Sequence, residues 1–416
     1  MDSRPSKPYH VQQLVDNPDA FPHHSSVSAL WNLKWKGLAV MAVYPFGDGK
    51  AEDFQEVFNN LIEASGDDYQ VFYDPEAYAA PFFPVGKRLL LEARAAESTD
   101  KAAARDLYLR AAAVFRIARF PINRSPASQM AWQYGKEAYM AASPYLDPPN
   151  QQVVIPHTHR DHSAGDGDNI YAYLRVPDKI EKPEKGWPVV LFICGLDAYR
   201  TDHTTRTQDH VHHGFACLSV DIPGTGDSPA APGDTCSPDR QWSSVLDWIA
   251  SPTGGQMYDL NEYRVIARGV STGGYYAMRI AHTHSNRLKA VVAQGGGSHH
   301  MFDEAWIRAQ NHMEYPFALA NALAAKFGSS SVEDYINSNP RARFSLEENG
   351  IFDMPCTRLL VINGMEDSIF PIEDSILACR RGRVKDARFI DSTGHMGNPG
   401  AEEIIYEWID EVAGRN

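Results

Sequence analysis

The sequence predicts an α/β domain with a doubly wound, mostly parallel sheet, preceded by a helical domain. Two observations support this fold class. Residues 1–150 carry apolar side chains at the three- and four-residue spacing of amphipathic helices. From Gln151 onward, short apolar runs alternate with helical patterns, as expected for parallel strands joined by right-handed crossovers. We therefore expect a helical cap domain over residues 1–150 and an α/β domain over residues 151–416.

Long helices are predicted for the N-terminal domain, and the clearest is an alanine-rich one over residues 102–120. Alanine has the highest helix propensity, and Pro121 ends the pattern. The domain also holds more aromatic residues than a small bundle needs, so some are candidates for the core and others for a pocket shared with the second domain. The predicted helices cover residues 54–64, 85–96, 102–120 and 126–142, and the aromatic residues are Trp31, Trp35, Tyr44, Phe82, Phe83, Trp132 and Tyr134.

The second domain begins with a predicted hairpin over residues 153–156 and 170–176. A nearly continuous apolar run at residues 188–195 then indicates a strand buried on both faces of the sheet. An insertion at about residues 298–353 has helical stretches and lies on the carboxyl side of the strands, the usual place for a lid. Further strands are expected at residues 215–220, 265–267, 290–293 and 359–362, core helices at 242–249, after Ser271 and at 401–413, and lid helices at 306–315, 317–327 and 332–337.

Composition and charge argue against several classes of function. Among 416 residues, 39 Lys and Arg stand against 53 Asp and Glu, a net charge of -14, which argues against nucleic acid or an anionic membrane as a partner. The sequence shows neither an apolar N-terminal segment typical of a signal peptide nor a window long enough for a membrane span. The five cysteines lack C-x-x-C spacing and fit a reducing compartment. We expect a cytoplasmic protein.

The stretch around Ser271 predicts a nucleophile. A short apolar run leads into Gly269-Val270-Ser271-Thr272-Gly273, and a helical pattern follows. In a G-x-S-x-G turn between a strand and a helix, the serine occupies a sharp, strained position, and the flanking glycines avoid contacts between a Cβ and the neighbouring backbone. The N-terminus of the following helix directs N–H groups and a positive dipole end to the same place.

Asp367 and His395 complete a predicted catalytic triad. Each follows the end of a predicted strand, and the order serine, aspartate, histidine along the chain is that of α/β-hydrolases. A serine hydroxyl needs a general base, and the imidazole of that base needs a carboxylate to hold its tautomer. Glu366 is an alternative to Asp367 as the acid, and Asp391, which precedes the histidine loop, is a weaker one.

The backbone N–H groups of Thr272 and Leu196 are predicted to form the oxyanion hole. Thr272 follows the nucleophile, and Leu196 lies in the turn that ends the first core strand. Gly195 in that turn lets the backbone approach a ligand closely. Asp197 and Arg200 are candidates for an ion pair that reinforces the turn, and a solvated pair is an equally good alternative.

One motif suggests metal chemistry. Residues His157, His159, Asp161 and His162 match H-x-H-x-D-H, a run that suits two divalent cations in the metallo-β-lactamase superfamily. A binuclear metal hydrolase would, however, build its core around this motif and take further ligands from later strands. Here the motif lies at the start of the α/β region, in a predicted hairpin tip. We therefore expect no metal.

Several motifs together resemble a known family. They are Phe120-Pro-Ile-Asn-Arg-Ser-Pro126 after a helical N-terminal half, Cys194-Gly-Leu-Asp197, Gly269-Val-Ser-Thr-Gly-Gly274, Gly364-Met-Glu-Asp367 and Gly394-His395. Over nearly the whole chain the sequence resembles the fungal polyketide-shortening α/β-hydrolases of naphthalene pigment biosynthesis, whose bacterial relatives include pseudooxynicotine C–C hydrolases and FrsA-like proteins. The triad motifs are common to all α/β-hydrolases, whereas the helical domain and the Gly-Leu-Asp turn are more specific.

The resemblance implies a cofactor-free, homodimeric serine hydrolase that acts on a small-molecule aromatic polyketide. Such an enzyme cleaves a C–C bond next to a ketone and releases an acetyl or acetoacetyl unit. An esterase or lactonase, or an acyl-transferring or lactone-forming enzyme, is the alternative. The cap and the lid are expected to close over Ser271 and to form an apolar, aromatic-lined pocket. Candidate substrate contacts are Arg119, Tyr134, His299, Trp306 and Tyr315.

Overall fold

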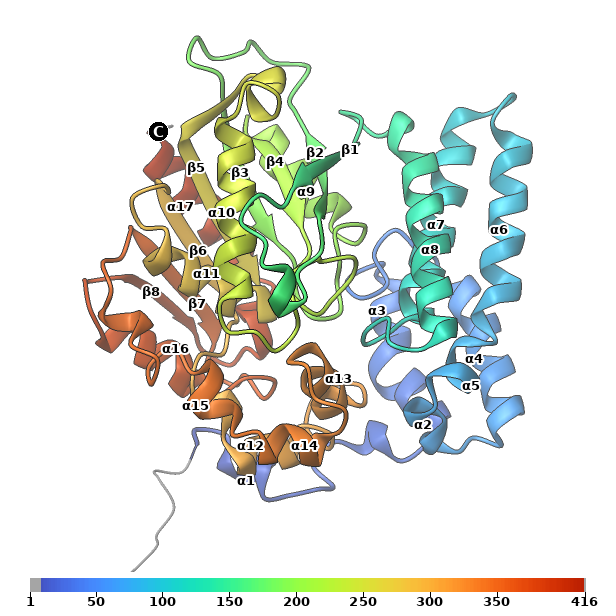
Figure 1. The fold of residues 1–416 in the computed structure, drawn as a ribbon. Helices are drawn as coiled ribbons and strands as arrows, with labels where there is room; N and C mark the ends of the chain where they lie inside the picture. Colours follow the sequence, from blue (N-terminus) through green and yellow to red (C-terminus); the bar gives the residue numbers. More distant parts are fainter. Residues whose placement is uncertain (1–8, 415–416) are drawn as a thin grey trace, which may run out of the picture.

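A helical unit stands beside an α/β unit in the computed structural model, which describes residues 9–414 (Figure 1). Short helical segments come first, and the π-helical residues Leu30–Trp35 lie between two of them. Each of the four predicted long helices is present. α1 (Gln12–Val15) lies against residues 306–313 of the α/β unit. The helices of the helical unit are α2 (Val27–Ala29), α3 (Lys36–Val40), α4 (Ala51–Ser65), α5 (Pro75–Ala79), α6 (Phe82–Ala96), α7 (Lys101–Ala118) and α8 (Pro126–Ala142).

Local sequence signals explain where α7 begins and ends. The Asp100 carboxylate accepts hydrogen bonds from two N–H groups of the first turn, each at 3.0 Å, and so caps the helix. The helix ends at Ala118, earlier than the predicted end at Phe120, because Pro121 disfavours a helical conformation of the residue before it. Phe120 thereby leaves the helix and stacks on Tyr315 of the α/β unit.

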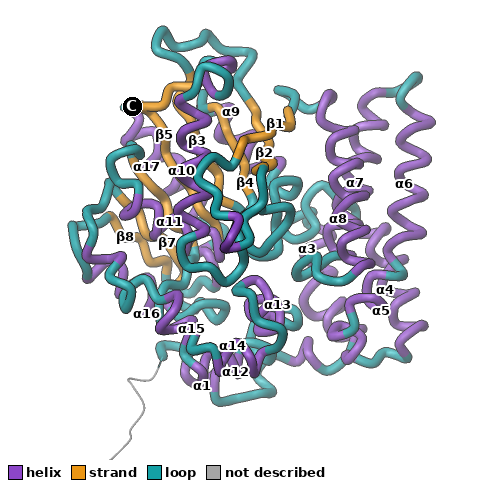
Figure 2. Tube along the Cα trace, in the orientation of Figure 1, coloured by secondary structure: helices purple, strands orange, loops and turns teal. Residues whose placement is uncertain are grey.

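Within residues 9–414, eight strands form one sheet in the order β1-β2-β4-β3-β5-β6-β7-β8. β1 and β2 form the predicted antiparallel hairpin, β2 also pairs antiparallel with β4, and the remaining neighbours are parallel. Figure 2 shows the strands gathered in one part of the molecule, away from the long helices α6, α7 and α8. This mostly parallel sheet confirms the predicted α/β class. The strands are β1 (Gln151–Pro156), β2 (Asn169–Arg175), β3 (Trp187–Ile193), β4 (Ala216–Val220), β5 (Leu260–Val270), β6 (Ala290–Gln294), β7 (Leu359–Gly364) and β8 (Asp386–Ile390).

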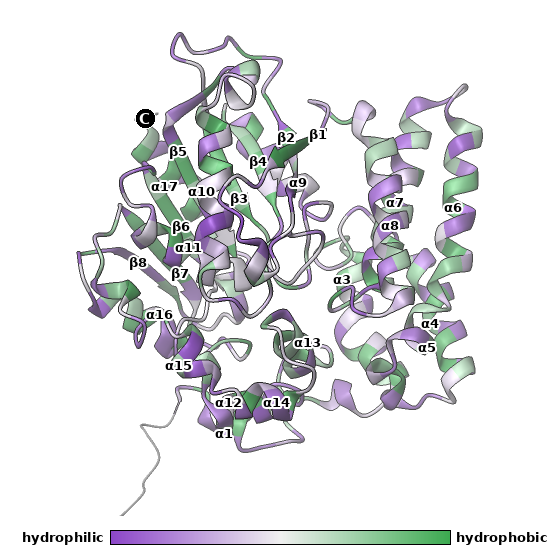
Figure 3. Ribbon diagram, viewed as in Figure 1, coloured by the Kyte–Doolittle hydropathy of each residue, from purple (hydrophilic) through white to green (hydrophobic). Residues whose placement is uncertain are grey.

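Alternate residues of the central strand β3 face opposite layers of helices. Val189 and Leu191 belong to the core that includes α10 and α11, whereas Val190 and Phe192 pack with α17. Because successive strand residues point to opposite faces, a sheet covered on both sides requires a fully apolar strand, and Figure 3 shows the central strands as hydrophobic. The flanking helices are α9 (Thr204–His212), α10 (Ser237–Ala250), α11 (Thr272–Thr283), α16 (Ile372–Arg380) and α17 (Ala401–Ala413).

The insertion between β6 and β7 is helical, as predicted, but its first helix is shorter. α12 covers Glu304–Ala309, where the sequence pattern predicts a helix over residues 306–315. Residues 310–318 form turns and irregular backbone and carry Tyr315. Pro316 contributes to the difference, since proline disfavours a helical conformation of the residue before it. The helices that follow are α13 (Leu319–Lys326), α14 (Val332–Asn337) and α15 (Pro340–Phe344). In the part of the chain that the structure describes, no helix has the length and apolar character needed to cross a membrane.

Buried ion pairs join the helical unit to the α/β unit. Arg116 and Arg119, at the end of α7, both pair with Asp202 in the segment after β3, and each of the three side chains is at most 2% exposed. Burial alone would raise the pKa of Asp202, but the two guanidinium groups lower it to about 2. The carboxylate is therefore ionised at neutral pH and binds α7 to the loop that follows β3.

Asp202→Ala should lower the free energy of unfolding by about 3–5 kcal/mol, because it leaves the buried Arg119 without its ion-pair partner and leaves Arg116 with only the more distant Asp48 carboxylate, at 3.9 Å. Chemical denaturation followed by tryptophan fluorescence measures this change. Asp106→Ala is the matched control on α7: its pair with Arg105 is exposed, so we expect a change within about 0.5 kcal/mol. Equal effects of the two substitutions would show that the buried cluster does not stabilise the protein.

Candidate active site

Ser271 lies in a strained turn between β5 and α11. Its backbone has φ 55° and ψ -126°, outside the conformations that ordinary residues adopt. A Cβ on Gly269 would lie 2.1 Å from the carbonyl oxygen of Gly273, and a Cβ on Gly273 would lie 2.4 Å from that of Cys194. Only glycine fits at both positions, and the close packing on either side fixes the backbone of Ser271.

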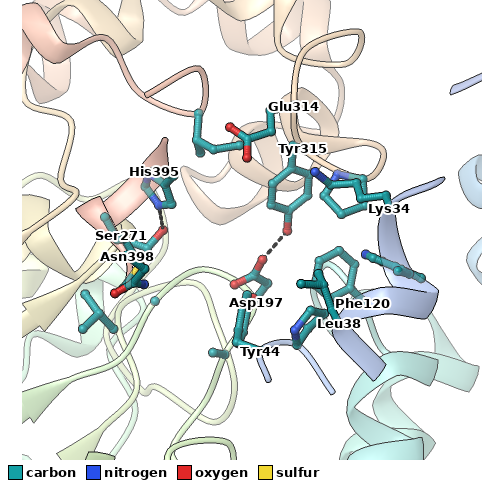
Figure 4. Close-up of a pocket in the computed structure, with 18 of the residues that line it drawn as sticks. Lys34, Leu38, Tyr44, Phe120, Asp197, Ser271, Glu314, Tyr315, His395 and Asn398 are labelled. Atoms are coloured by element: carbon teal, nitrogen blue, oxygen red, sulfur yellow. Dashed lines mark hydrogen bonds between the residues drawn. The ribbon is translucent and has the colours of Figure 1, made fainter. Parts of the chain in front are cut away.

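The structure brings Ser271, His395 and Asp367 together. His395 Nε2 is 2.8 Å from the Ser271 hydroxyl oxygen (Figure 4), and His395 Nδ1 is 2.9 Å from Asp367 Oδ2. Because an ionised carboxylate can only accept hydrogen bonds, the Nδ1–H donates to Asp367 and Nε2 accepts from the serine hydroxyl. In this arrangement an imidazole is able to take the serine proton.

Neither alternative acid lies at this place. The Glu366 side chain is 48% exposed and pairs with a surface histidine, and Asp391 is exposed. Asp367 is fully buried, and its other oxygen accepts hydrogen bonds from two backbone N–H groups of the following turn at 2.8 and 3.0 Å. These bonds hold the carboxylate toward His395.

Two opposing effects set the pKa of His395. Burial disfavours the imidazolium and lowers the pKa, whereas the Asp367 carboxylate raises it through its charge and its hydrogen bond. The Glu314 and Asp197 carboxylates add smaller contributions in the same direction. The pKa of His395 is raised overall, so the ring is a stronger base than an ordinary histidine.

The two predicted oxyanion-hole residues lie on the backbone segments next to the nucleophile. Thr272 is the first residue of α11, so its N–H has no acceptor within the helix. Leu196 lies in the turn after β3, which packs directly on the nucleophile, because a Cβ on Gly195 would be 3.5 Å from the Ser271 Cβ. Their function as oxyanion donors stays a prediction.

The turn after β3 is held from two directions, and not by an ion pair between Asp197 and Arg200. Arg200 pairs with Asp221 instead. The Asp197 carboxylate accepts a hydrogen bond from the Tyr315 hydroxyl at 2.5 Å (Figure 4), and its main-chain carbonyl accepts one from Arg119 at 3.0 Å. The insertion and the helical unit thus both fix this turn.

Three parts of the chain enclose one cavity at Ser271 (Figure 4). Most of its lining is apolar or aromatic, and four charged side chains are included. The predicted cap and lid therefore both border the nucleophile. The helical unit contributes Lys34, Trp35, Leu38, Tyr44, Pro45 and Phe120, the insertion contributes Glu314, Tyr315 and Pro316, and the rest of the α/β unit contributes Gly195, Asp197, Ala198, His203, Arg206, Val270, Ser271, Ile369, His395, Met396 and Asn398.

Among the five predicted substrate contacts, Tyr315 lines this cavity. Its ring stacks on Phe120 with the centroids 5.5 Å apart. Burial, and then the charge of Asp197, raise the pKa of the Tyr315 hydroxyl well above its ordinary value, so it stays a hydrogen-bond donor. Of the aromatic residues noted in the helical unit, Trp35 and Tyr44 also line the cavity, and the others do not.

Arg119 and Tyr134 were predicted to contact the substrate, but the structure gives them other partners. The Arg119 guanidinium is buried; it pairs with Asp202 and lies 3.6 Å from the ring centroid of Tyr199. Tyr134 stacks on Phe115 inside the helical unit, with the centroids 5.1 Å apart. Helical spacing shows that such residues are buried, but not which of two neighbouring units their side chains reach.

His299 and Trp306 also lie away from the cavity lining, contrary to prediction. A ring nitrogen of His299 is 2.6 Å from the Ser345 hydroxyl oxygen, a contact within the insertion. Trp306 is fully buried, and its Nε1–H donates to the Ile369 carbonyl at 3.2 Å. His299 therefore makes a contact within the insertion, whereas Trp306 joins the insertion to the segment after β7.

Lys34 and Glu314 are cavity residues that the sequence analysis missed. Burial lowers the pKa of the Lys34 ammonium group, and the charge of Glu314 opposes this effect. Nothing in the sequence marks either residue, because single Lys and Glu residues are mostly solvated on the surface. Lys34 lies in the π-helical segment, and such turns are frequent at functional sites, but a sequence pattern does not reveal them.

The residues of the H-x-H-x-D-H motif take separate partners. His157 Nδ1 lies 2.9 Å from the Ser244 hydroxyl oxygen, and His159 Nε2 lies 2.6 Å from the Asp247 carboxylate. His162 is exposed. Over residues 9–414, no group of three or more His, Cys, Asp or Glu side chains is arranged to hold a metal ion.

Comparison with known families and curated proteins points to esterases. The family model described as "Esterase FrsA-like" matches residues 85–411. Esterase FrsA of Yersinia pestis (strain Pestoides F) is 24% identical over 299 residues, which cover 70% of this chain and 66% of that protein. Esterase FrsA of Yersinia pseudotuberculosis serotype O:1b (strain IP 31758) gives the same values. The chain thus spans 66% of the length of these curated relatives.

Solved structures share the fold. The 2,6-dihydroxy-pseudo-oxynicotine hydrolase superimposes with a TM-score of 0.64 at 18% identity, covering 85% of this chain and 96% of that one. Wild-type AbyA5 gives a TM-score of 0.63 at 16% identity, covering 92% and 95%. At these identities the likeness shows the fold alone, and it confirms the predicted α/β-hydrolase class. The comparisons support the FrsA-like part of the resemblance and do not single out polyketide-shortening enzymes.

Asp367→Asn should lower the pKa of His395, because it removes the carboxylate that raises this pKa. In the wild type, we expect the imidazole to titrate above the ordinary histidine value of about 6.5. NMR titration of the histidine ring signals measures both values, and His395→Gln identifies the signal. If the pKa stays the same in Asp367→Asn, the carboxylate does not interact with the ring as the geometry indicates.

Proposed function

The chain belongs to the FrsA-like esterase family, and we propose that it is a serine hydrolase with Ser271 as its nucleophile. The observation that carries this proposal is the continuous set of hydrogen bonds from Ser271 to His395 and from His395 to Asp367. A serine in a strained turn, a base of raised pKa and a buried carboxylate are the parts that nucleophilic catalysis needs. A protein that only binds a ligand has no use for this combination.

The proposed mechanism proceeds through an acyl-enzyme. Ser271 attacks a carbonyl carbon while His395 Nε2 takes the serine proton, and Asp367 stabilises the resulting imidazolium. The N–H groups of Thr272 and Leu196 bind the tetrahedral oxyanion. When the intermediate collapses, the leaving group departs with the proton from His395. The imidazole then takes a proton from water, which attacks the acyl-enzyme and releases the acid.

We infer that the bond cleaved is a C–C bond next to a ketone in a small aromatic polyketide. The aromatic side chains of Trp35, Phe120 and Tyr315 in the cavity lining suit a flat substrate. When the C–C bond breaks, its electron pair moves into a neighbouring carbonyl and forms an enolate, which His395 protonates. The products are an acid with an acetyl or acetoacetyl unit and a shortened ketone. A homodimer stays a prediction from the resemblance.

Ester hydrolysis is the second candidate, because the family is one of esterases. The same residues cleave an ester with an alkoxide as the leaving group. The hydrogen bonds among Ser271, His395 and Asp367 serve both reactions equally, so the leaving group that the cavity accepts decides between them. Acyl transfer and lactone formation differ only in the nucleophile that attacks the acyl-enzyme.

Ser271→Ala and His395→Ala should each lower kcat on a para-nitrophenyl ester by several orders of magnitude, about 10⁴–10⁶-fold, because each removes a group that acts in the transition state. Steady-state kinetics measure the loss, and a fluorophosphonate should label Ser271 in the wild type. Ser163→Ala, in the exposed hairpin tip, should keep full activity. An active enzyme that the reagent does not label at Ser271 would refute the assignment, and activity lost to a chelator and restored by zinc would favour a metal hydrolase.

Incubation with an aromatic β-diketone polyketide should release acetate or acetoacetate and a shortened ketone, because the enolate leaving group is stabilised by the neighbouring carbonyl. Mass spectrometry follows the products, and Ser271→Ala is the control for spontaneous cleavage. Rapid turnover of simple esters with the polyketide intact would instead establish an esterase. An isomeric lactone without loss of mass would indicate ring closure.

A further inference from the structure

The Asp197 carboxylate is a buried charge that the proposed mechanism does not use. It is 7% exposed and lines the same cavity as Ser271 and His395. The Arg119 guanidinium makes no ion pair with this carboxylate, because it donates to the Asp197 main-chain carbonyl and pairs with Asp202. A polar group that lines a mostly apolar cavity is a candidate for a function in binding.

Tyr315 leaves part of this carboxylate available to a ligand. The Tyr315 hydroxyl donates to Asp197 Oδ2 at 2.5 Å, from the opposite wall of the cavity (Figure 4). The Tyr44 phenol, which also lines the cavity, meets the same carboxylate: burial, and then the charge of Asp197 and a hydrogen bond to it, raise the pKa of Tyr44 well above its ordinary value. A carboxylate has about four acceptor positions on its two oxygens, and two phenol donors fill at most two of them. The phenols therefore orient the carboxylate and leave acceptor positions for a donor on a bound molecule.

The position of the charge is unfavourable for an ester with no hydrogen-bond donor. Asp197 follows Leu196, and the turn that holds both packs on the nucleophile, with a Gly195 Cβ placed 3.5 Å from the Ser271 Cβ. A negative charge here repels the tetrahedral oxyanion that forms on Ser271. A ligand that fills the cavity without donating a hydrogen bond also leaves the carboxylate desolvated and unsatisfied.

We propose that Asp197 selects substrates that carry a hydroxyl group on the carbon β to the carbonyl attacked by Ser271. The hydroxyl donates a hydrogen bond to the Asp197 carboxylate, which delocalises the negative charge of the carboxylate. This bond replaces the hydrogen bonds to water that the carboxylate loses when the substrate fills the cavity. Alcohols and the enol form of β-dicarbonyl compounds both meet this requirement. The inference rests on the proposed function of Ser271 and narrows its substrate class. No proton transfer is involved, and Asp197 determines specificity by accepting a hydrogen bond.

The test compares the para-nitrophenyl esters of butanoate and of β-hydroxybutanoate, using both enantiomers of the latter. The measured quantity is the ratio of kcat/KM for the better hydroxylated enantiomer to kcat/KM for butanoate. In the wild type we expect a ratio of roughly ten or more, since a site built to bind a hydroxyl discriminates against the analogue without it. In Asp197→Asn the ratio should fall at least about tenfold, because the charged acceptor is removed and the butanoate ester gains from the loss of repulsion.

Three controls make the result unambiguous. Asp197→Glu keeps a carboxylate and should retain a preference for the hydroxylated ester, whereas Asp106→Asn, on the exposed surface of α7, should leave both rates unchanged. Ser271→Ala should abolish turnover of both esters, and if it does not, the proposed function fails independently of Asp197.

The ratio alone decides the inference on Asp197. A wild-type ratio near one overturns it, whether or not the variants fold. A ratio in Asp197→Asn that stays near the wild-type value also overturns it, and equal losses on both esters would mean that Asp197 only supports the turn.

Discussion

The packing of two backbone turns against each other at Ser271 is the constraint on which the site depends. Ser271 occupies a strained conformation, which costs on the order of 1–3 kcal/mol. The backbone of Gly273 lies so close to Cys194 that a Cβ would approach the Cys194 carbonyl to 2.4 Å. The nucleophile turn and the turn after β3 are thereby fixed together. The same contacts set the position of the serine hydroxyl relative to the turn that carries Leu196, the predicted oxyanion donor.

The helical unit forms part of the site rather than a separate covering. Pro121 ends α7 early, and Phe120 then reaches the cavity and stacks on Tyr315 of the insertion. Tyr315 in turn holds Asp197 of the turn after β3, and Arg119 of the helical unit binds the same turn from behind. Residues from three parts of the chain therefore hold one carboxylate in the wall of the cavity that contains Ser271.

The sequence predicts those features that local patterns determine. Strand periodicity, helix caps and the glycines around Ser271 act over a few residues, so the sequence predicts the sheet and the long helices. The approach of His395 to Ser271 follows because the strands that precede them end at one edge of the sheet. The contacts of side chains whose neighbours come from distant parts of the chain could not be predicted in this way. The sequence predicts Arg119 and His299 as substrate contacts, and His299 follows the strand after the nucleophile helix, but a long-range ion pair and a hydrogen bond hold the two side chains elsewhere. Lys34 lines the cavity and lies in a π-helical turn, which the periodicity of the sequence does not reveal.

The most direct test of this account is to trap the acyl-enzyme. Wild-type protein is mixed with excess para-nitrophenyl ester, quenched in acid within milliseconds, and analysed by intact-protein and peptide mass spectrometry. The account predicts one acyl group on each enzyme molecule, carried by the peptide that contains Ser271 and absent from Ser271→Ala. Two results would contradict the account. One is turnover of the ester with the acyl group on a residue other than Ser271, and the other is turnover while Ser271 stays unmodified at every quench time.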